Sequence, residues 1–352
     1  MSTMSWFLGF LYSQLLVTPP TPVKSFVEQT VIVTGSNTGL GLDAARHMTR
    51  LNAAKVILAV RNTSKGEAAK KSIEESTGRL GVVEVWPLDL SSYESVKQFA
   101  ARASKELKRI DVLLENAGMM VTKFEITEED ESTVTTNVVS TFLLGLLLLP
   151  KLRETAQRYN VTPRLTVVSS DLHFVTAFHE RNANNIFEAL SDKENANMGE
   201  RLMHPERFPS IASLLTPSNR YATTKLLEIL LVRQISSRIT SPATKRVPVI
   251  VNTLTPGACR SDFFREEQNF LARTTMAIAK RLLARTAEVG SRTLVAAASG
   301  GEETAGKYMA DSVVSYESPF VLSEEGERVG EKVWRELMEK LERIQPGISK
   351  NV

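Results

Sequence analysis

Cysteine is almost absent from the sequence. Cys259 is the only one in 352 residues, so disulfides cannot form the framework of the fold. A chain of this length can bury a large core without them, and their absence fits the reducing cytoplasm, where we expect the protein. A strong excess of one charge is also missing. Lys and Arg number 43 against 40 Asp and Glu, and a net charge of +3 excludes the basic surface typical of nucleic-acid binding.

Hydrophobic runs long enough to span a membrane are missing too. The uncharged run at residues 6–17 falls short of the about 20 residues that a spanning helix needs. It lacks the basic start and the cleavage site of a secretory signal. Two interpretations stay open, a cap on the apolar surface of the domain or an interfacial membrane anchor. The anchor would insert Trp6, Phe7, Phe10 and Leu11. A second run, residues 141–149, ends at Pro150 and is expected to be a buried core helix.

Short β-branched runs alternate with helical stretches along most of the chain. This alternation predicts an α/β fold with a doubly wound parallel sheet covered on both faces. The expected strands are residues 30–34, 55–60, 81–87, 110–114, 164–169 and 248–254. The expected helices are residues 42–51, 64–76, 92–107, 128–149 and 221–237. The predicted organisation is an apolar segment (1–28), one domain (29–320) and a C-terminal amphipathic helix with its tail (321–352).

A glycine-rich loop follows the first expected strand. The segment Val31-Ile-Val-Thr-Gly-Ser-Asn-Thr-Gly-Leu-Gly41 leads from a buried strand into a helix, the context in which such loops bind dinucleotides. Gly35 permits the tight turn, and Gly39 and Gly41 let the backbone approach a pyrophosphate at the helix N-terminus. The loop residues predicted to contact a cofactor are Gly35, Ser36, Asn37, Thr38, Gly39, Leu40 and Gly41.

The spacing Thr-Gly-x-x-x-Gly-x-Gly resembles single-domain members of the short-chain dehydrogenase/reductase family. The extended branch of that family carries Thr-Gly-x-x-Gly-x-x-Gly instead. The resemblance runs from residue 29 to residue 308 and implies a Rossmann fold with strand order 3-2-1-4-5-6-7. It also implies further cofactor contacts from Asp89, Leu90, Asn116, Ala117, Gly118, Pro256, Gly257 and Ser261. Glu115 departs from the pattern, because the family has Asn at that position.

The residue after the second strand selects the form of the nicotinamide cofactor. An acidic residue about 20 positions past the glycines binds the ribose of NAD, whereas an Arg accommodates the 2′-phosphate of NADP. Arg61 stands there, with Lys65 close behind, and no acidic residue lies between positions 55 and 65. The sequence therefore predicts NADP as the cofactor, although a surface Arg at a strand end is the alternative.

Tyr221 and Lys225 are four residues apart in Tyr-Ala-Thr-Thr-Lys, so they share one face of the expected helix. An ammonium beside a phenol favours the phenolate, and we expect Lys225 to lower the pKa of Tyr221 from about 10. The family resemblance implies that Ser170 polarises the substrate oxygen, with Ser169 as the alternative, and that Asn137 supports a water chain to the Lys. It implies hydride transfer from NADPH to a carbonyl carbon with Tyr221 as proton donor. It also implies that Tyr221 and Lys225 contact the cofactor, with Lys225 on the ribose hydroxyls.

Residues 171–220 form an insert between Ser170 and Tyr221 that is longer than the family's usual gap. We expect a lid or wall over the substrate pocket, and a solvated surface excursion is the alternative. The apolar faces of residues 142–149 and 226–232 suggest pairing in a homodimer.

The leading function is therefore an NADP(H)-dependent oxidoreductase that acts on a ketone, aldehyde or secondary alcohol of a small apolar or polyketide-like substrate, without a metal. Two patterns refine the resemblance. One pattern, Ala-Val-Arg-Asn with Lys-Gly-Glu-Ala-Ala, resembles retinol-dehydrogenase-like and WW-domain-oxidoreductase-like members of the family. The other, Phe-Leu-Tyr-Ser-Gln near the start of the chain, resembles fungal tailoring reductases. The alternatives are a non-catalytic NADP-binding scaffold, with the insert deforming the site, and a methyltransferase, which Arg61 disfavours.

Overall fold

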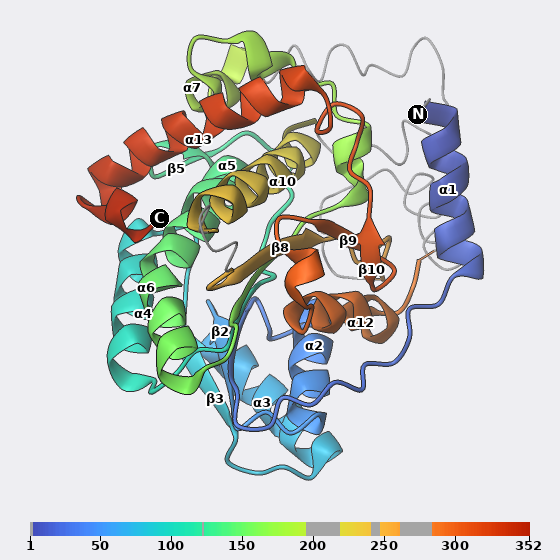
Figure 1. The fold of residues 1–352 in the computed structure, drawn as a ribbon, viewed down its shortest axis with the longest axis vertical. Helices are drawn as coiled ribbons and strands as arrows, with labels where there is room; N and C mark the ends of the chain where they lie inside the picture. Colours follow the sequence, from blue (N-terminus) through green and yellow to red (C-terminus); the bar gives the residue numbers. More distant parts are fainter. Residues whose placement is uncertain (1–2, 122, 195–218, 241–246, 261–283) are drawn as a thin grey trace.

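The computed structural model describes residues 3–121, 123–194, 219–240, 247–260 and 284–352. In this part of the chain, the main sheet has the strand order β10-β9-β8-β7-β4-β1-β2-β3 (Figure 1). All neighbours pair in parallel except β9 and β10. Counted along the chain, the parallel strands follow the order 3-2-1-4-5-6-7, which confirms the predicted Rossmann fold. The strands are β1 (Thr30–Thr34), β2 (Lys55–Val60), β3 (Val83–Pro87), β4 (Val112–Glu115), β7 (Arg164–Val168), β8 (Ile250–Leu254), β9 (Tyr308–Ala310) and β10 (Val313–Ser315).

Two hydrophobic clusters separate the sheet from the helices on its faces. One face carries α2 (Gly39–Arg50), α3 (Thr63–Thr77) and α12 (Ala287–Ala298). The other carries α4 (Tyr93–Glu106), α6 (Thr141–Tyr159) and α10 (Asn219–Ile239). The strands β1, β2, β4, β7 and β8 are buried along most of their length, as a sheet covered on both faces requires.

The helix expected at residues 128–149 differs from the prediction at both ends. It is preceded by a small hairpin of β5 (Ile126–Thr127) and β6 (Asp130–Glu131), and α5 (Ser132–Val134) starts only at Ser132. The π-helical turn η1 (Thr135–Ser140) follows, and α6 runs through Pro150 to Tyr159. The continuous helix 132–159 is long and apolar enough to cross a membrane, but 94% of its most apolar window is buried inside the protein. It is the predicted core helix, extended beyond its expected end.

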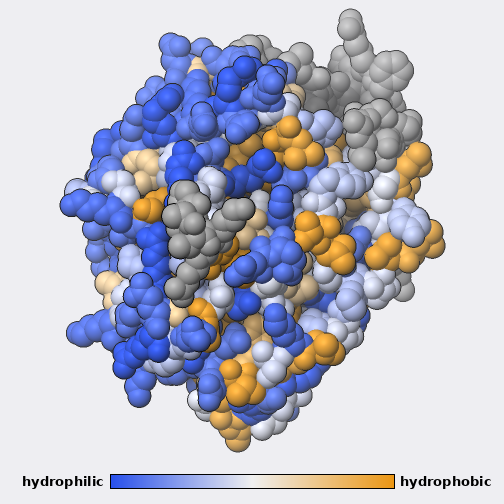
Figure 2. Space-filling view, in the orientation of Figure 1, coloured by the Kyte–Doolittle hydropathy of each residue, from blue (hydrophilic) through white to orange (hydrophobic). Residues whose placement is uncertain are grey.

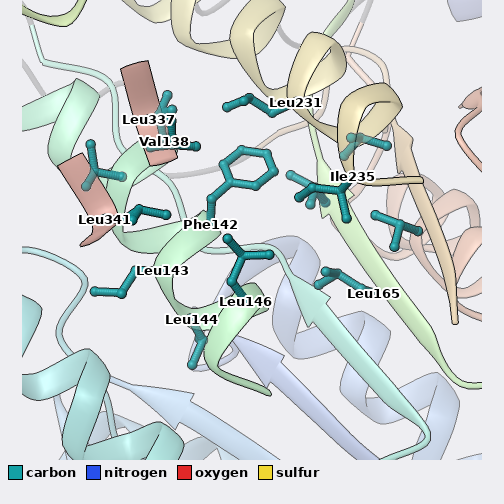
Figure 3. Packing of buried hydrophobic residues seen from close by; sticks show 14 of the residues in the cluster. Val138, Phe142, Leu143, Leu144, Leu146, Leu165, Leu231, Ile235, Leu337 and Leu341 are labelled. Atoms are coloured by element: carbon teal, nitrogen blue, oxygen red, sulfur yellow. The ribbon is translucent and has the colours of Figure 1, made fainter. Parts of the chain in front are cut away.

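The C-terminal helix α13 (Glu324–Ile344) lies across α6 and α10 (Figure 1). Figure 3 shows how it closes the core: side chains of three helices and one strand meet around Phe142, among them Leu231, Ile235, Leu337, Leu341 and Leu165. Residues 142–149 and 226–232, from which subunit pairing was predicted, are therefore mostly buried within their own chain. The homodimer stays a prediction.

The described first half of the insert, residues 171–194, belongs to the packed structure. It contains η2 (Asp171–Phe174), η3 (His179–Asn182) and α7 (Ile186–Leu190), and α7 packs against α13. The backbone N–H of Ile186 donates to Oε2 of Glu336 at 2.8 Å. The expectation of a lid falls mainly on residues 195–218, which lie outside the described residues.

The N-terminal helix α1 (Thr3–Leu16) packs against the domain by one face. Arg285 Nη2 donates to the carbonyl oxygens of Ser13 (2.7 Å) and Val17 (3.0 Å), and it forms an ion pair with Asp311 at 2.7 Å. These bonds satisfy carbonyls at the end of a helix that carries no basic residue in its last turn.

The opposite face of α1 is apolar and exposed. Its residues are Leu8, Tyr12, Leu15 and Leu16, and apolar side chains gather at the right edge of Figure 2, where Figure 1 places α1. Trp6 and Phe10 instead stack on each other, with ring centroids 5.7 Å apart, and Trp6 reaches Phe174. The four residues that the sequence suggested as an anchor are half-buried, and their insertion into a membrane stays a prediction.

Candidate active site

The glycine loop is fixed by the ends of two neighbouring strands. The hydroxyl of Thr34, at the end of β1, accepts hydrogen bonds from the backbone N–H groups of Asn116 (3.0 Å) and Ala117 (2.8 Å). In return, Nδ2 of Asn116 donates to the carbonyl oxygen of Thr34 at 2.9 Å. A Cβ at Gly41 would collide with Asn116, which explains why the third glycine is needed. The Asn-Ala-Gly motif therefore packs against the glycine loop and fixes its conformation.

The N-terminus of α2 is arranged to receive an anion. Gly39 begins the helix in the left-handed region (φ 59°), and Thr38 forms no side-chain cap. A Cβ built on Gly39 meets nothing within 4 Å, so this side of the loop faces open space. Uncapped N–H groups at a helix N-terminus favour phosphate. The loop thus fits the pyrophosphate of a dinucleotide.

Arg61 and Lys65 lie at the expected place for the adenosine end of the cofactor. Arg61 directly follows β2, and its exposed side chain makes no hydrogen bond or ion pair within the described residues. The backbone N–H of Lys65 donates to Oδ1 of Asn62, and the Lys65 side chain is exposed. Asp89 and Leu90 follow β3, where Asp89 accepts from Ser91 and orders the turn. The exposed side chains of Arg61 and Lys65 can therefore reach a 2′-phosphate from solvent.

The structure brings Ser170 and Tyr221 together. Ser170 follows β7, Tyr221 lies in the first turn of α10, and their side chains share a hydrogen bond. Ser169 points the other way, since its Oγ donates to the carbonyl oxygen of Lys225 at 2.7 Å. Of the two serines, Ser170 is therefore the one that faces the Tyr.

Lys225 is buried below Tyr221, with its ammonium 5.6 Å from the centre of the Tyr ring. Its Nζ donates to the carbonyl oxygen of Val168 at 2.8 Å and to Oε1 of Glu228 at 2.7 Å. Burial, followed by the nearby carboxylate of Glu228, raises the pKa of the Tyr221 hydroxyl. In the protein without ligands this pKa is therefore raised and not lowered as expected, with burial as the main cause and Glu228 as the second.

Asn137 lies in η1, and a π-helical turn inside a helix is typical of functional sites. Its Oδ1 accepts from the N–H of Met119 (2.8 Å), and its Nδ2 donates to the Met119 carbonyl (2.9 Å) and to Thr224 Oγ1 (3.1 Å). Asn137 therefore fastens the loop after β4, which holds Gly118, to α10. A water chain from Asn137 to Lys225 stays a prediction.

His173 supports the loop that carries Ser170. The ring is buried, its Nδ1 lies 2.8 Å from the carbonyl oxygen of Ser170, and its Nε2 accepts from the N–H of Ser318 at 3.1 Å. Because Nε2 accepts, the ring proton belongs on Nδ1. Burial lowers the pKa of His173 to about 4. It is a neutral structural histidine.

Pro256 and Gly257 follow β8, where the nicotinamide end of a cofactor is expected. Gly257 adopts a positive φ of 74°, and a Cβ there would collide with Nε2 of Gln14 from α1. Gln14 is buried, yet neither atom of its amide finds a hydrogen-bond partner in the described structure. Ser261 lies outside the described residues.

Three residues of the site were missed by sequence reasoning. Gln14 belongs to a segment without a motif, so no sequence signal pointed to it. Glu115 was noted as a departure from the family pattern, and Glu228 lies three residues after Lys225 on the same helix face. Glu115 and Glu228 together were the signal in the sequence that carboxyl groups lie near Lys225.

Comparisons with known proteins agree with this geometry. A sequence model described as short chain dehydrogenase matches residues 29–161. The short chain dehydrogenase/reductase dmxR8 of Cryptosporiopsis sp. (strain 8999) is 42% identical over 347 residues, which cover 98% of this chain and 100% of that protein. The short-chain dehydrogenase anuD of Penicillium roqueforti (strain FM164) is 43% identical over 344 residues, covering 97% of this chain and 84% of that one. The chain belongs to the short-chain dehydrogenase/reductase family.

Solved structures of the family share the fold. The RhlG/NADP active-site complex of Pseudomonas aeruginosa superposes with a TM-score of 0.58 at 18% identity, covering 82% of this chain and 96% of that one. This likeness supports the fold only. Membership of the short-chain dehydrogenase/reductase family makes the protein an oxidoreductase of a family that binds a nicotinamide cofactor, as the resemblance in the sequence implied.

Proposed function

We propose that this short-chain dehydrogenase/reductase uses NADP(H) to interconvert a ketone or aldehyde with the alcohol of a small apolar substrate. The hydrogen-bonded pair of Ser170 and Tyr221, with Lys225 beneath it, is the observation that carries the proposal. The pair lies at the carboxyl edge of the sheet, where a doubly wound fold binds its ligands. Arg61, exposed and unpaired within the described residues, supports NADP over NAD.

The residues divide the chemistry as follows. A bound NADPH supplies the hydride. The hydroxyl of Ser170 donates a hydrogen bond to the substrate carbonyl oxygen, and Tyr221 gives that oxygen its proton as negative charge develops. Lys225 and Asn137 hold α10 and the loop after β4 in place around the reacting groups. The glycine loop, Arg61 and the Pro256–Gly257 turn would hold the cofactor.

Aromatic rings beside Ser170 favour an apolar substrate. Phe174, four residues after Ser170, lies 6.0 Å from Trp6 of α1 and 6.2 Å from Tyr316, measured between ring centroids. The side chains of Trp6 and Phe174 are half-buried, and Phe174 ends the short helix η2 that begins directly after Ser170. The curated relatives named above come from fungi, which supports a polyketide-like substrate and a role in secondary metabolism.

A thermal unfolding experiment tests the first step. The purified protein is heated alone, with NADPH or with NADH, and a ligand that binds the native state must raise the midpoint. We expect a larger rise with NADPH. The same protein then reduces a panel of apolar ketones, with Tyr221→Phe as the control that binds NADPH but transfers no hydride. No midpoint shift with either cofactor would remove the enzymatic proposal. A shift without turnover would favour the non-catalytic scaffold.

The cellular location belongs to the same proposal. We place the protein in the cytoplasm, with the exposed face of α1 as its contact with a membrane surface. Flotation with neutral lipid vesicles tests the contact, and Leu15→Ser with Leu16→Ser should abolish it. Wild-type protein that stays unbound would limit α1 to its packing role.

A further inference from the structure

Two carboxyl groups face the buried core beneath the proposed active site. Glu115 ends β4 and Glu228 lies on α10, and each is 2% exposed. Both oxygens of Glu115 lack a hydrogen-bond partner in the described structure, as does Oε2 of Glu228. The remaining oxygen of Glu228 accepts from the ammonium of Lys225 at 2.7 Å. Proton transfer from Tyr221 needs neither carboxyl directly.

Two neighbouring buried carboxyls cannot both be ionised, because each charge loses its hydration and repels the other. The negative charge belongs on Glu228, which has a cation beside it. Burial, reinforced by Glu228, raises the pKa of Glu115 well above its usual range. Burial also raises the pKa of Glu228, but Lys225 opposes the effect and the pKa is held at about 7. Glu115 is thus the neutral acid, and Glu228 becomes the ion as the pH rises through about 7.

The consequence reaches Tyr221 through Lys225. A bare ammonium would favour the phenolate, whereas an ammonium paired with a carboxylate presents little net charge to its surroundings. After burial, the charge of Glu228 is the main influence that keeps the Tyr221 proton in place. A protonated phenol is the form that a carbonyl reductase needs as its acid.

We propose that Glu228 is a positioning residue that offsets the charge of Lys225, with Glu115 as its neutral partner, so that Tyr221 keeps its proton as the acid of carbonyl reduction. The proposal rests on the proposed function for its catalytic meaning. The effect of Glu228 on the ionisation of Tyr221 does not require a bound cofactor.

Other titratable groups near α10 are engaged elsewhere. In the described structure, Lys225 is the charged group that acts on Glu228, and Glu228 is the one that acts on Glu115. The elements packed around α10 bring further groups that bind other partners, namely Asp171 and His173 of η2, Glu131 beside α5, and Glu336 and Lys340 of α13. The effect on Tyr221 is therefore assigned to Glu228.

The test titrates Tyr221 directly in the protein without cofactor. The near-ultraviolet absorbance of phenolate is followed with rising pH, and the curve of Tyr221→Phe is subtracted to isolate this residue. In E228Q the Gln oxygen still accepts from Lys225 but carries no charge. We expect the phenolate of Tyr221 to appear at least about one pH unit lower than in the wild type.

The matched control is E115Q, which replaces an equally buried carboxyl that we assign as neutral. It should leave the Tyr221 curve in place. An unshifted curve in E228Q, or equal shifts in both variants, would overturn the proposal. Should E228Q fail to fold, the pair E228D and E228N repeats the comparison of a charged with a neutral side chain at equal length.

Activity adds a second readout that separates this proposal from the function. The alkaline limb of the kcat profile for reduction should move to lower pH in E228Q and stay in place in E115Q. If NADPH does not bind, the proposed function fails while the absorbance titration still decides the role of Glu228. If NADPH binds and the titration shows no shift, the function stands and the role of Glu228 is refuted.

Discussion

Nδ2 of Asn351 donates a hydrogen bond to the carbonyl oxygen of Leu146 at 3.0 Å. In a regular helix that oxygen accepts from the N–H four residues later, which here is Pro150 and has no N–H. The second-last residue of the chain therefore supplies the bond that a proline removes from the middle of α6. Arg153 reinforces the contact by donating to the Asn351 carbonyl at 2.6 Å.

Replacement of Asn351 by Ala should destabilise the fold by about 1 kcal/mol, because a partly buried carbonyl loses its donor. Denaturant unfolding followed by circular dichroism measures the change. Lys350→Ala is the control, since that side chain is exposed and should leave the midpoint unchanged. Equal midpoints for the Asn351 variant and the wild type would show that water replaces the lost donor.

The same contact shows where sequence reasoning on the fold stops. Strands β1 and β2 were predicted to the residue, because β-branched runs bounded by polar residues carry their own signal. The end of α6 was predicted at Pro150, which is the correct local rule. It fails because the compensating donor, Asn351, lies 205 positions after Leu146, whose carbonyl it satisfies. A tertiary hydrogen bond has no local pattern.

The candidate site divides in a similar way. The glycine loop, Ser170, Tyr221 and Lys225 were found from motifs, and the structure brings them to one edge of the sheet. The pKa of Tyr221 was expected to fall and is instead raised, mainly by burial and then by the carboxylate of Glu228. Motifs identify reactive groups, whereas the charges around those groups depend on the packing.

Acid should destabilise the protein through His173. Its pKa is about 4 in the folded protein and about 6.5 when unfolded, so the unfolded chain binds more protons in this window. Stability present above pH 6.5 is lost as the pH falls toward 4, by about 3 kcal/mol from this residue. His173→Gln should flatten the dependence of the unfolding free energy on pH in this range. An unchanged slope would assign the acid sensitivity to other groups.

Arg61 should decide between the two cofactors. Arg61→Ala removes the cation expected at the 2′-phosphate, so the Kd for NADPH should rise about tenfold or more while the Kd for NADH stays constant. Isothermal titration with both cofactors measures the ratio. Lys65→Ala, one turn into α3, is the matched variant and should have a smaller effect. A proportional loss of both cofactors would place the adenosine ribose elsewhere.

The α13 helix should be essential to the core. Leu337 is fully buried between α6 and α10, and its replacement by Ala should cost about 2 to 5 kcal/mol. Glu339→Ala on the exposed side of the same helix serves as the control and should cost little. Unfolding in urea gives both values. Equal losses would indicate that α13 acts through helix propensity and not through packing.

Gln14 should show opposite effects on stability and on cofactor binding. Its buried amide lacks a hydrogen-bond partner in the described structure, and such a group costs about 1 to 3 kcal/mol when left unsatisfied. Gln14→Leu removes the polar atoms at similar volume, so the protein alone should melt at a higher temperature than the wild type.

The position of Gln14 against Gly257 gives the other half of this prediction. We expect the Pro256–Gly257 turn to hold the nicotinamide end of the cofactor, where an amide side chain is suited to pair with the carboxamide. The midpoint rise that NADPH causes should therefore be smaller in Gln14→Leu, although the variant starts from a higher midpoint. A variant that gains stability and keeps the full NADPH response would confine Gln14 to the packing of α1.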